Sequence, residues 1–173
     1  MKAIASVLLL ASSFAFAQQH DLKPAEALAK LSFMKGSWQG KQDFNTQGGA
    51  AMVGDASNEI SDAIGGRYLC EMLSTKIADR KPTDTRHFIS YDPKLGKYTA
   101  WWFTDTSVGP LSFEGDLVDS KLVLVSKPGA GGTVLRATYE SPKPQVLTYT
   151  LEMQRDGTWT KLFMTTYGRR VPG

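Results

Sequence analysis

Cysteine and histidine are scarce in this sequence of 173 residues, and their scarcity excludes several kinds of site. The single cysteine, Cys70, has no second cysteine with which to form a disulfide inside the chain. We expect it to be a small buried apolar side chain rather than a reactive thiol. The two histidines, His20 and His87, form neither a His-x-His nor an HExxH pattern. The sequence therefore predicts no metal site.

An excess of charge of one sign is also lacking. The 20 Lys and Arg residues nearly balance the 17 Asp and Glu residues, which leaves a formal net charge of +3. Proteins that bind nucleic acid or an anionic membrane surface usually concentrate positive charge. We therefore expect neither of these partners.

The N-terminal 17 residues have the three parts of a secretory signal peptide. Lys2 supplies the positive region, residues 4–16 supply a short apolar region, and Ala15-Phe16-Ala17 forms a small-x-small cleavage site. The apolar region is too short to span a membrane. We expect residues 1–17 to be removed and the mature protein, starting at Gln18, to be periplasmic or secreted. The residue after the cleavage site is Gln18 and not a cysteine that could carry a lipid, so no membrane anchor is expected.

One short helix and one domain are predicted for the mature chain. Residues 18–30 are assigned to a polar lead and a helix, whose apolar periodicity starts at Pro24 and extends to Met34. Residues 31–170 are assigned to a single β domain. Ten short β-runs separated by turn residues predict its strands, at residues 37–44, 51–61, 67–75, 85–91, 97–104, 112–118, 121–127, 133–140, 146–154 and 158–169.

The short links between these runs favour antiparallel pairing of consecutive strands. A meander of ten strands has two bare edges unless it closes on itself. The predicted fold class is therefore all-β: a closed or nearly closed antiparallel up-and-down barrel of about ten strands, with a short N-terminal helix.

The first predicted strand begins with a Gly-x-Trp-x-Gly pattern. Gly36 can adopt backbone conformations that other residues adopt only at a cost. Trp38 offers a large apolar ring with one N–H donor. Gly40 lies on the same face two residues later and permits a bend or a close approach of another segment.

Four stretches give the chain a resemblance to the calycin superfamily of lipocalin-like barrels. They are residues 34–40, 65–69, 91–98 and 166–169, and they occur in a matching order and spacing. More closely, the chain resembles a family of bacterial calycin-like domains with no agreed activity. The resemblance implies a small-ligand barrel in which Arg169, at the end of the last strand, crosses the ring of Trp38.

The Gly-x-Trp-x-Gly pattern also looks like the start of the haem-binding nitrobindin barrels. Those proteins coordinate iron through a histidine late in the chain, but no histidine follows His87 here. The pair Gly40-Lys41 also departs from the small continuation typical of that family. We therefore predict that the protein binds no haem, and no other cofactor is expected.

The run Trp101-Trp102-Phe103 is an aromatic candidate for ligand contact. Side chains alternate along a strand, so one of the two indoles faces the barrel interior, although the sequence does not decide which. The candidate ligand-binding residues are Trp101, Trp102, Phe103, His87, Tyr91, Arg67 and Glu71. The predicted function is non-covalent binding of a small, largely apolar molecule.

Two alternatives remain open. The first is an enzyme, a hydrolase or isomerase that uses an interior carboxylate, with Glu59, Glu71, Asp105 and Glu114 as candidates and no catalytic residue assigned. A Cys70–His87 pair is also conceivable for such an enzyme. The second alternative is a filled barrel that binds a protein partner. A cavity of roughly 300 Å³ or more lined by aromatics would favour ligand binding, and an interior packed solid would favour the scaffold. A cavity holding a buried carboxylate beside His87 or Arg67 would favour an enzyme.

Overall fold

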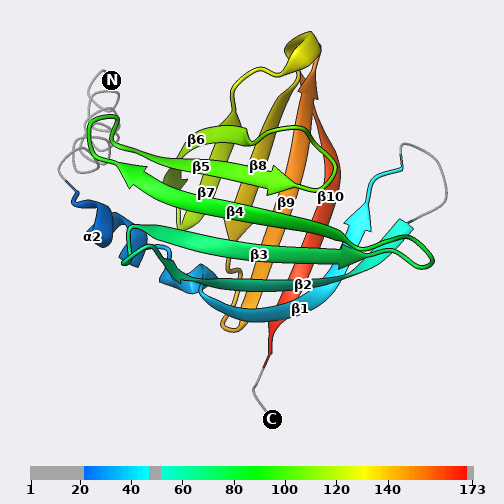
Figure 1. Cartoon of the computed structure of the whole chain (residues 1–173), viewed down its shortest axis with the longest axis horizontal. Helices are drawn as coiled ribbons and strands as arrows, with labels where there is room; N and C mark the ends of the chain where they lie inside the picture. Colours follow the sequence, from blue (N-terminus) through cyan, green and yellow to red (C-terminus); the bar gives the residue numbers. More distant parts are fainter. Residues whose placement is uncertain (1–21, 47–51, 171–173) are drawn as a thin grey trace, which may run out of the picture.

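Ten strands follow one short helix in the computed structural model, which describes residues 22–46 and 52–170 (Figure 1). The helical segments are α2 (Pro24–Ala29) and a 3-10 turn (Ser32–Met34). The strands are β1 (Gly36–Phe44), β2 (Met52–Ala63), β3 (Tyr68–Lys76), β4 (Thr83–Asp92), β5 (Lys97–Thr104), β6 (Leu111–Val118), β7 (Lys121–Ser126), β8 (Val134–Glu140), β9 (Val146–Arg155) and β10 (Thr158–Arg169). The predicted signal peptide and residue 51, where the second run was predicted to begin, lie outside the described residues.

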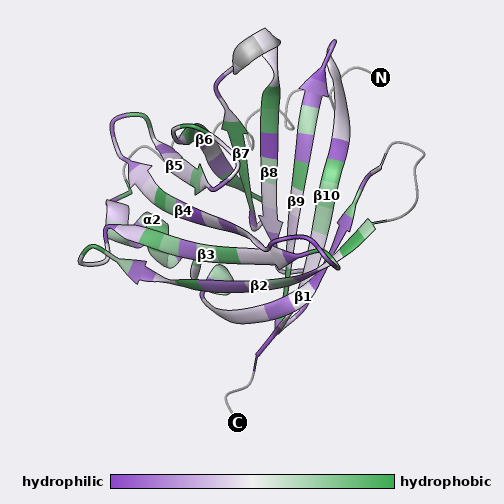
Figure 2. Cartoon of the chain, turned by 45° about the vertical axis from the view of Figure 1, so that its right-hand side comes forward, coloured by the Kyte–Doolittle hydropathy of each residue, from purple (hydrophilic) through white to green (hydrophobic). Residues whose placement is uncertain are grey.

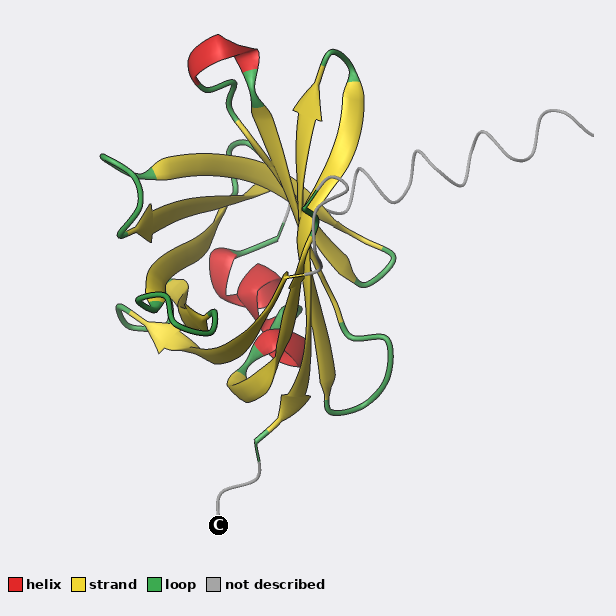
Figure 3. Ribbon diagram, turned by 90° about the vertical axis from the view of Figure 1, so that its right-hand side faces the viewer, coloured by secondary structure: helices red, strands yellow, loops and turns green. Residues whose placement is uncertain are grey.

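Every strand pairs antiparallel with its neighbours, and the first pairs with the last. The strands curve round into a barrel (Figure 3). The pairing of β1 with β10 closes the barrel. It extends from the Trp38–Arg169 pair to the Phe44–Phe163 pair, which is most of the length of both strands. This closure confirms the predicted fold class. It also leaves no open sheet edge among the ten strands of the described chain.

Alternation along the strands decides which side chains enter the barrel, and polar and apolar bands accordingly alternate along several strands (Figure 2). On β3 the side chains of Leu69, Glu71 and Leu73 are buried. On β5 the buried side chain of the aromatic run is Trp102, while Phe103 is 45% exposed. The interior therefore contains both apolar groups and charged or hydrogen-bonding groups.

The helix is shorter than the sequence predicted. It ends at Ala29 instead of continuing to Met34, because the next backbone N–H groups bond only three residues back, from Lys30 to Ala27 and from Leu31 to Leu28. Gly36 follows the C-cap residue of the 3-10 turn. It opens β1 with a φ of 131°, a conformation that favours glycine.

The helical segments cover one end of the barrel. Ala27, Leu28 and Leu31 are buried in the core, and α2 packs against β4. The Tyr98 hydroxyl at the start of β5 donates to the Ala27 carbonyl oxygen at 2.8 Å. Trp38 Nε1 donates to the Met34 carbonyl oxygen, also at 2.8 Å. This end therefore includes the end of β4 and the start of β5.

The strand junction that closes the barrel depends on a very close backbone approach. A Cβ atom at Gly40 would lie 2.0 Å from the carbonyl oxygen of Thr166 on β10. The predicted contact at the same junction is present, since the Arg169 guanidinium carbon lies 4.4 Å from the centre of the Trp38 ring. The guanidinium also occupies the space where a side chain at Gly36 would project.

Candidate functional site

A buried carboxylate forms the centre of a polar cluster inside the barrel. Glu71 on β3 and His87 on β4 occupy paired positions, and their Oε2 and Nδ1 atoms are 2.5 Å apart. The Tyr139 hydroxyl, from β8 across the barrel, donates to the same Oε2 at 2.7 Å. Asn58 Nδ2 on β2 donates to Oε1 at 2.5 Å. All four residues are at most 3% exposed.

These contacts set the charge of the cluster. Burial tends to raise the pKa of Glu71, but the charge of His87 and the hydrogen bonds from His87, Tyr139 and Asn58 outweigh it and hold that pKa below its ordinary value. Burial, followed by the nearby charge of Glu71, raises the pKa of Tyr139 well above its ordinary value. Glu71 is therefore an ionised acceptor and Tyr139 a neutral donor.

The same argument fixes the proton on His87. An ionised carboxylate only accepts hydrogen bonds, so Nδ1 of His87 must carry the proton that it shares with Glu71. The imidazole ring stacks on Trp102 with 4.1 Å between ring centres and an angle of 18°. Trp102 in turn stacks on Phe113 at 3.9 Å. The ring is thus held in place, and no described side chain bonds its other nitrogen, Nε2.

An interior cavity of about 260 Å³ lies next to this histidine. It is bordered by the start of β4 and the end of β5, and therefore lies at the end of the barrel opposite α2. His87, Trp102 and Tyr149 line it and are at most 4% exposed. Of these three side chains, only the imidazole is paired with the buried carboxylate of Glu71.

The walls of the cavity differ in character. One side is apolar, and its side chains are Phe44, Leu111, Leu135, Leu151 and Phe163. The other side has hydroxyl groups from Thr75, Thr83, Thr85, Thr104 and Thr106. Such a cavity can enclose a molecule with an apolar body and a few hydrogen-bonding groups.

Gln42 adds a second fixed polar group to the cavity. Its Oε1 accepts from the hydroxyls of Thr75 at 2.9 Å and Thr165 at 3.3 Å. Gln42 is 4% exposed and lines the cavity. Its Nε2 hydrogens have no bonding partner among the described side chains, so they can donate to a ligand.

Three of the residues singled out in the sequence lie together: Glu71, His87 and Trp102. Tyr91 is also buried, but it lies toward the α2 end, where its ring is 5.3 Å from that of Tyr98. The remaining three, Trp101, Phe103 and Arg67, lie outside the interior. Trp101 packs against Tyr68 on the outer face, and Arg67 is exposed in the turn before β3.

The other candidates for chemistry also point away from the cavity. Glu59 accepts a hydrogen bond of 2.5 Å from the Ser37 hydroxyl on the outer face, and Glu114 lies 3.6 Å from Lys127. Asp105 is exposed in the turn after β5. The conceivable Cys70–His87 pair is wrong, because alternation places Cys70 on the outer face of the sheet and His87 on the inner face.

Four further residues of the site were not predicted from the sequence: Asn58, Tyr139, Tyr149 and Gln42. A signal existed for Asn58, which occupies an inward position between the buried Ala56 and Ile60. For Tyr139 no local signal distinguishes it from a core aromatic residue. It lies 52 positions beyond His87 in the chain, and only closure of the barrel brings the two side chains together.

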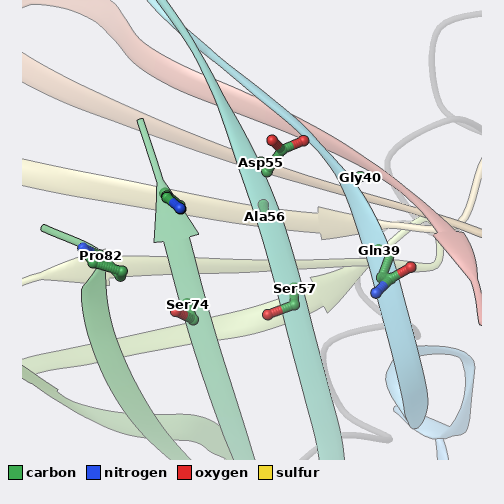
Figure 4. A pocket seen from close by; sticks show the side chains of 8 residues that line it. Gln39, Gly40, Asp55, Ala56, Ser57, Ser74 and Pro82 are labelled. Carbon is green, nitrogen blue, oxygen red and sulfur yellow. The ribbon is translucent and has the colours of Figure 1, made fainter. Parts of the chain in front are cut away.

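A larger hollow of about 420 Å³ lies on the outer surface of β1, β2 and β3 (Figure 4). Its labelled side chains include Gln39, Asp55, Ser57 and Ser74. They are polar and exposed or half-buried, and Asp55 is paired with Lys41. This hollow lacks the enclosed apolar wall and the buried ionisable group of the interior cavity, so the interior cavity is the better candidate site.

Within residues 22–46 and 52–170, no three His, Cys, Asp or Glu side chains are grouped so that they could hold a metal ion. No helix in these residues has the length and apolar character needed to cross a membrane.

Fold and site together define a closed ten-stranded antiparallel barrel with a covered end and an interior polar cluster. The chain belongs to the family described as protein of unknown function DUF1579, whose model matches residues 23–169. Thirteen solved chains are similar in structure. One is the crystal structure of Rv2717c from M. tuberculosis, which is 17% identical, with 87% of this chain and 100% of that chain covered and a TM-score of 0.62. This likeness shows the fold alone, and no curated protein matches the sequence.

Proposed function

We propose that this protein is an exported, calycin-like barrel that binds a small, largely apolar molecule in its interior cavity. The observation that carries the proposal is the cavity of about 260 Å³ between an apolar wall and the buried ring of His87. Export rests on the signal-peptide pattern of residues 1–17.

The size and lining of the cavity indicate the kind of ligand. Pockets for drug-sized ligands have volumes of roughly 300–1,000 Å³, so this cavity suits a molecule at or below the small end of that range. Apolar surface that leaves water is stabilised by roughly 25 cal/mol per Å², and the Leu and Phe wall offers such a surface. The unfilled space supports ligand binding over a filled barrel that acts only as a scaffold.

Tryptophan fluorescence tests the proposal, because Trp102 lines the cavity and Trp101 lies on the outer face. We would titrate the uncharged dye N-phenyl-1-naphthylamine into the wild type and into the Trp101→Phe and Trp102→Phe variants. Saturable quenching should persist in Trp101→Phe and be lost or strongly reduced in Trp102→Phe. Equal quenching in both variants would place the dye elsewhere.

A pair of filling variants provides the matched control. Leu135→Phe adds volume to a residue that lines the cavity, whereas Val125→Phe adds the same kind of ring to an exposed position on β7. Dye affinity should fall only in Leu135→Phe. Absence of saturable binding in the wild type, or equal affinity in both filling variants, would overturn the proposal.

The pairing of Glu71 with His87 favours a second candidate function, proton-transfer catalysis. Glu71 already accepts three hydrogen bonds, so Nε2 of His87 is the group that could take a proton from a substrate, while the carboxylate would stabilise the resulting imidazolium. Deuterium exchange at the α-carbon of 2-tetralone, followed by NMR, tests this function. Exchange no faster than in His87→Phe would exclude that activity.

A further inference from the structure

We propose that the interior cavity selects neutral alcohols or phenols with a small apolar body and discriminates against the corresponding carboxylates. The inference rests on the proposed binding function and adds the chemical class of the ligand. The selectivity follows from two features of the polar cluster around Glu71 and His87 next to the cavity. One is the charge of the cluster, and the other is the position of the proton on His87.

The charge of the interior is the first feature. Glu71 is an ionised carboxylate that is 0% exposed. No Lys or Arg is among the buried residues of the described chain, so its only possible counter-ion inside the barrel is the imidazolium form of His87. A ligand carboxylate would bring a second negative charge into the same region of low polarity. Like charges repel strongly there, because little water screens them.

The proton on His87 is the second feature. Nδ1 donates to Glu71, so a neutral imidazole presents the lone pair of Nε2 toward the cavity. A lone pair accepts a hydrogen bond, and a hydroxyl group can donate one. A carboxylate has no proton to donate, and a pure hydrocarbon would leave the buried nitrogen without a partner, which costs binding energy.

The other side chains around His87 add no charge to the region that faces the imidazole. Tyr139 from β8 and Tyr149 from β9 face the imidazole, and burial raises the pKa of both phenols well above their ordinary values, so they stay neutral. Trp102 from β5 carries no ionisable group. Glu71 is therefore the one fixed charge that faces the ring in the described structure.

Three ligands with one ring system test the inference: naphthalene, 2-naphthol and 2-naphthoate. At pH 8, isothermal titration of the wild type should show 2-naphthol binding about tenfold or more tightly than each of the other two, as expected for one buried hydrogen bond. Arg86→Gln changes an exposed charge on the outer face beside His87, and it should leave this order unchanged.

Two variants test separately the hydrogen bond to Nε2 of His87 and the buried charge of Glu71. His87→Phe keeps an aromatic ring next to Trp102 and removes Nε2, so 2-naphthol should lose its advantage over naphthalene. Glu71→Gln removes the buried charge, and its amide can donate to Nδ1, which allows the proton of a neutral imidazole to move to Nε2. In this variant 2-naphthoate should gain affinity relative to 2-naphthol.

The outcomes distinguish this inference from the function on which it rests. If 2-naphthoate binds as tightly as 2-naphthol at pH 8, or if the advantage of 2-naphthol survives in His87→Phe, the selectivity is overturned while ligand binding stands. If none of the three compounds nor the uncharged dye binds saturably, the proposed binding function itself fails.

Discussion

Glu71 and His87 face each other as a registered pair on β3 and β4, with 2.5 Å between Oε2 and Nδ1 and at most 1% of either side chain exposed. A buried carboxylate is stable in a protein only when hydrogen bonds and opposite charge replace its hydration. Asn58 and Tyr139 supply the remaining bonds from two other strands. The pair therefore joins distant parts of the barrel as well as forming the candidate site.

Removal of the carboxylate should strongly destabilise the fold. We expect Glu71→Ala to lower the free energy of unfolding by about 3–5 kcal/mol, because its partners would remain buried without their acceptor. Urea denaturation measures this change. Glu114→Ala is the control, since its ion pair with Lys127 is partly exposed and should contribute at most about 1 kcal/mol. Losses of equal size would contradict the structural role of the buried cluster.

Acid should remove the stabilisation that comes from Glu71. Its pKa in the folded protein lies below the ordinary value of 4.5, so the folded state favours the ionised form more than the unfolded chain does. The resulting stability is fully present above about pH 4.5 and is lost as the pH falls through the folded-state pKa. Urea melts of the wild type between pH 7 and pH 3 should show this loss. The same series on Glu71→Gln should have a shallower slope, and parallel slopes would refute the assignment.

Closure of the barrel should depend on the absence of a side chain at Gly40. In Gly40→Ala the new Cβ would clash with the Thr166 carbonyl oxygen, and β1 and β10 would have to separate. We expect a loss of about 1–3 kcal/mol or more in urea melts. Gly168→Ala on β10 is the matched control, because no atom lies within 4 Å of the new Cβ. A Gly40→Ala protein as stable as Gly168→Ala would disprove this account of the junction.

The contact between Arg169 and the Trp38 ring should stabilise the same junction by a smaller amount. An exposed cation over an indole contributes about 0.5–1 kcal/mol, so Arg169→Ala should lower the urea midpoint measurably. Arg170 is exposed, and its backbone N–H rather than its side chain bonds Ser37. Arg170→Ala should therefore have little effect. If the two variants lose the same small amount, the cation–π contact does not contribute to stability.

Export should yield a protein that begins at Gln18. The prediction follows from Lys2, the apolar residues 4–16 and the Ala15-Phe16-Ala17 cleavage site. N-terminal sequencing of protein from the cell envelope or the medium provides the measurement. Replacing Ala17 with Arg should block cleavage, while intact wild-type chain retained in the cytoplasm would rule out export.

The number and order of the strands could be predicted because their signals are local. Residues 92–96 form a turn in which Asp92 Oδ1 accepts from the backbone N–H groups of Lys94 and Leu95, and Gly96 adopts a φ of 65°. Proline and glycine at fixed positions identify such a turn in the sequence. The contact of Trp38 with Arg169 that closes the barrel was predicted only from the resemblance to calycins. The two residues are far apart in the sequence, near its first and last strands, so no local signal connects them.

The amino-acid sequence by itself determined the β-runs, their turns and the short helix, because strand alternation and turn chemistry act over a few residues. Tertiary structure alone decided that Trp102 faces inward while Trp101 faces outward, since a period of two allows either face to be buried. It also decided that Glu71, His87 and Tyr139 meet. Pairing of β3 with β4 brings Glu71 and His87 together, whereas Tyr139 lies 68 positions beyond Glu71 and reaches it only because the sheet curves into a barrel.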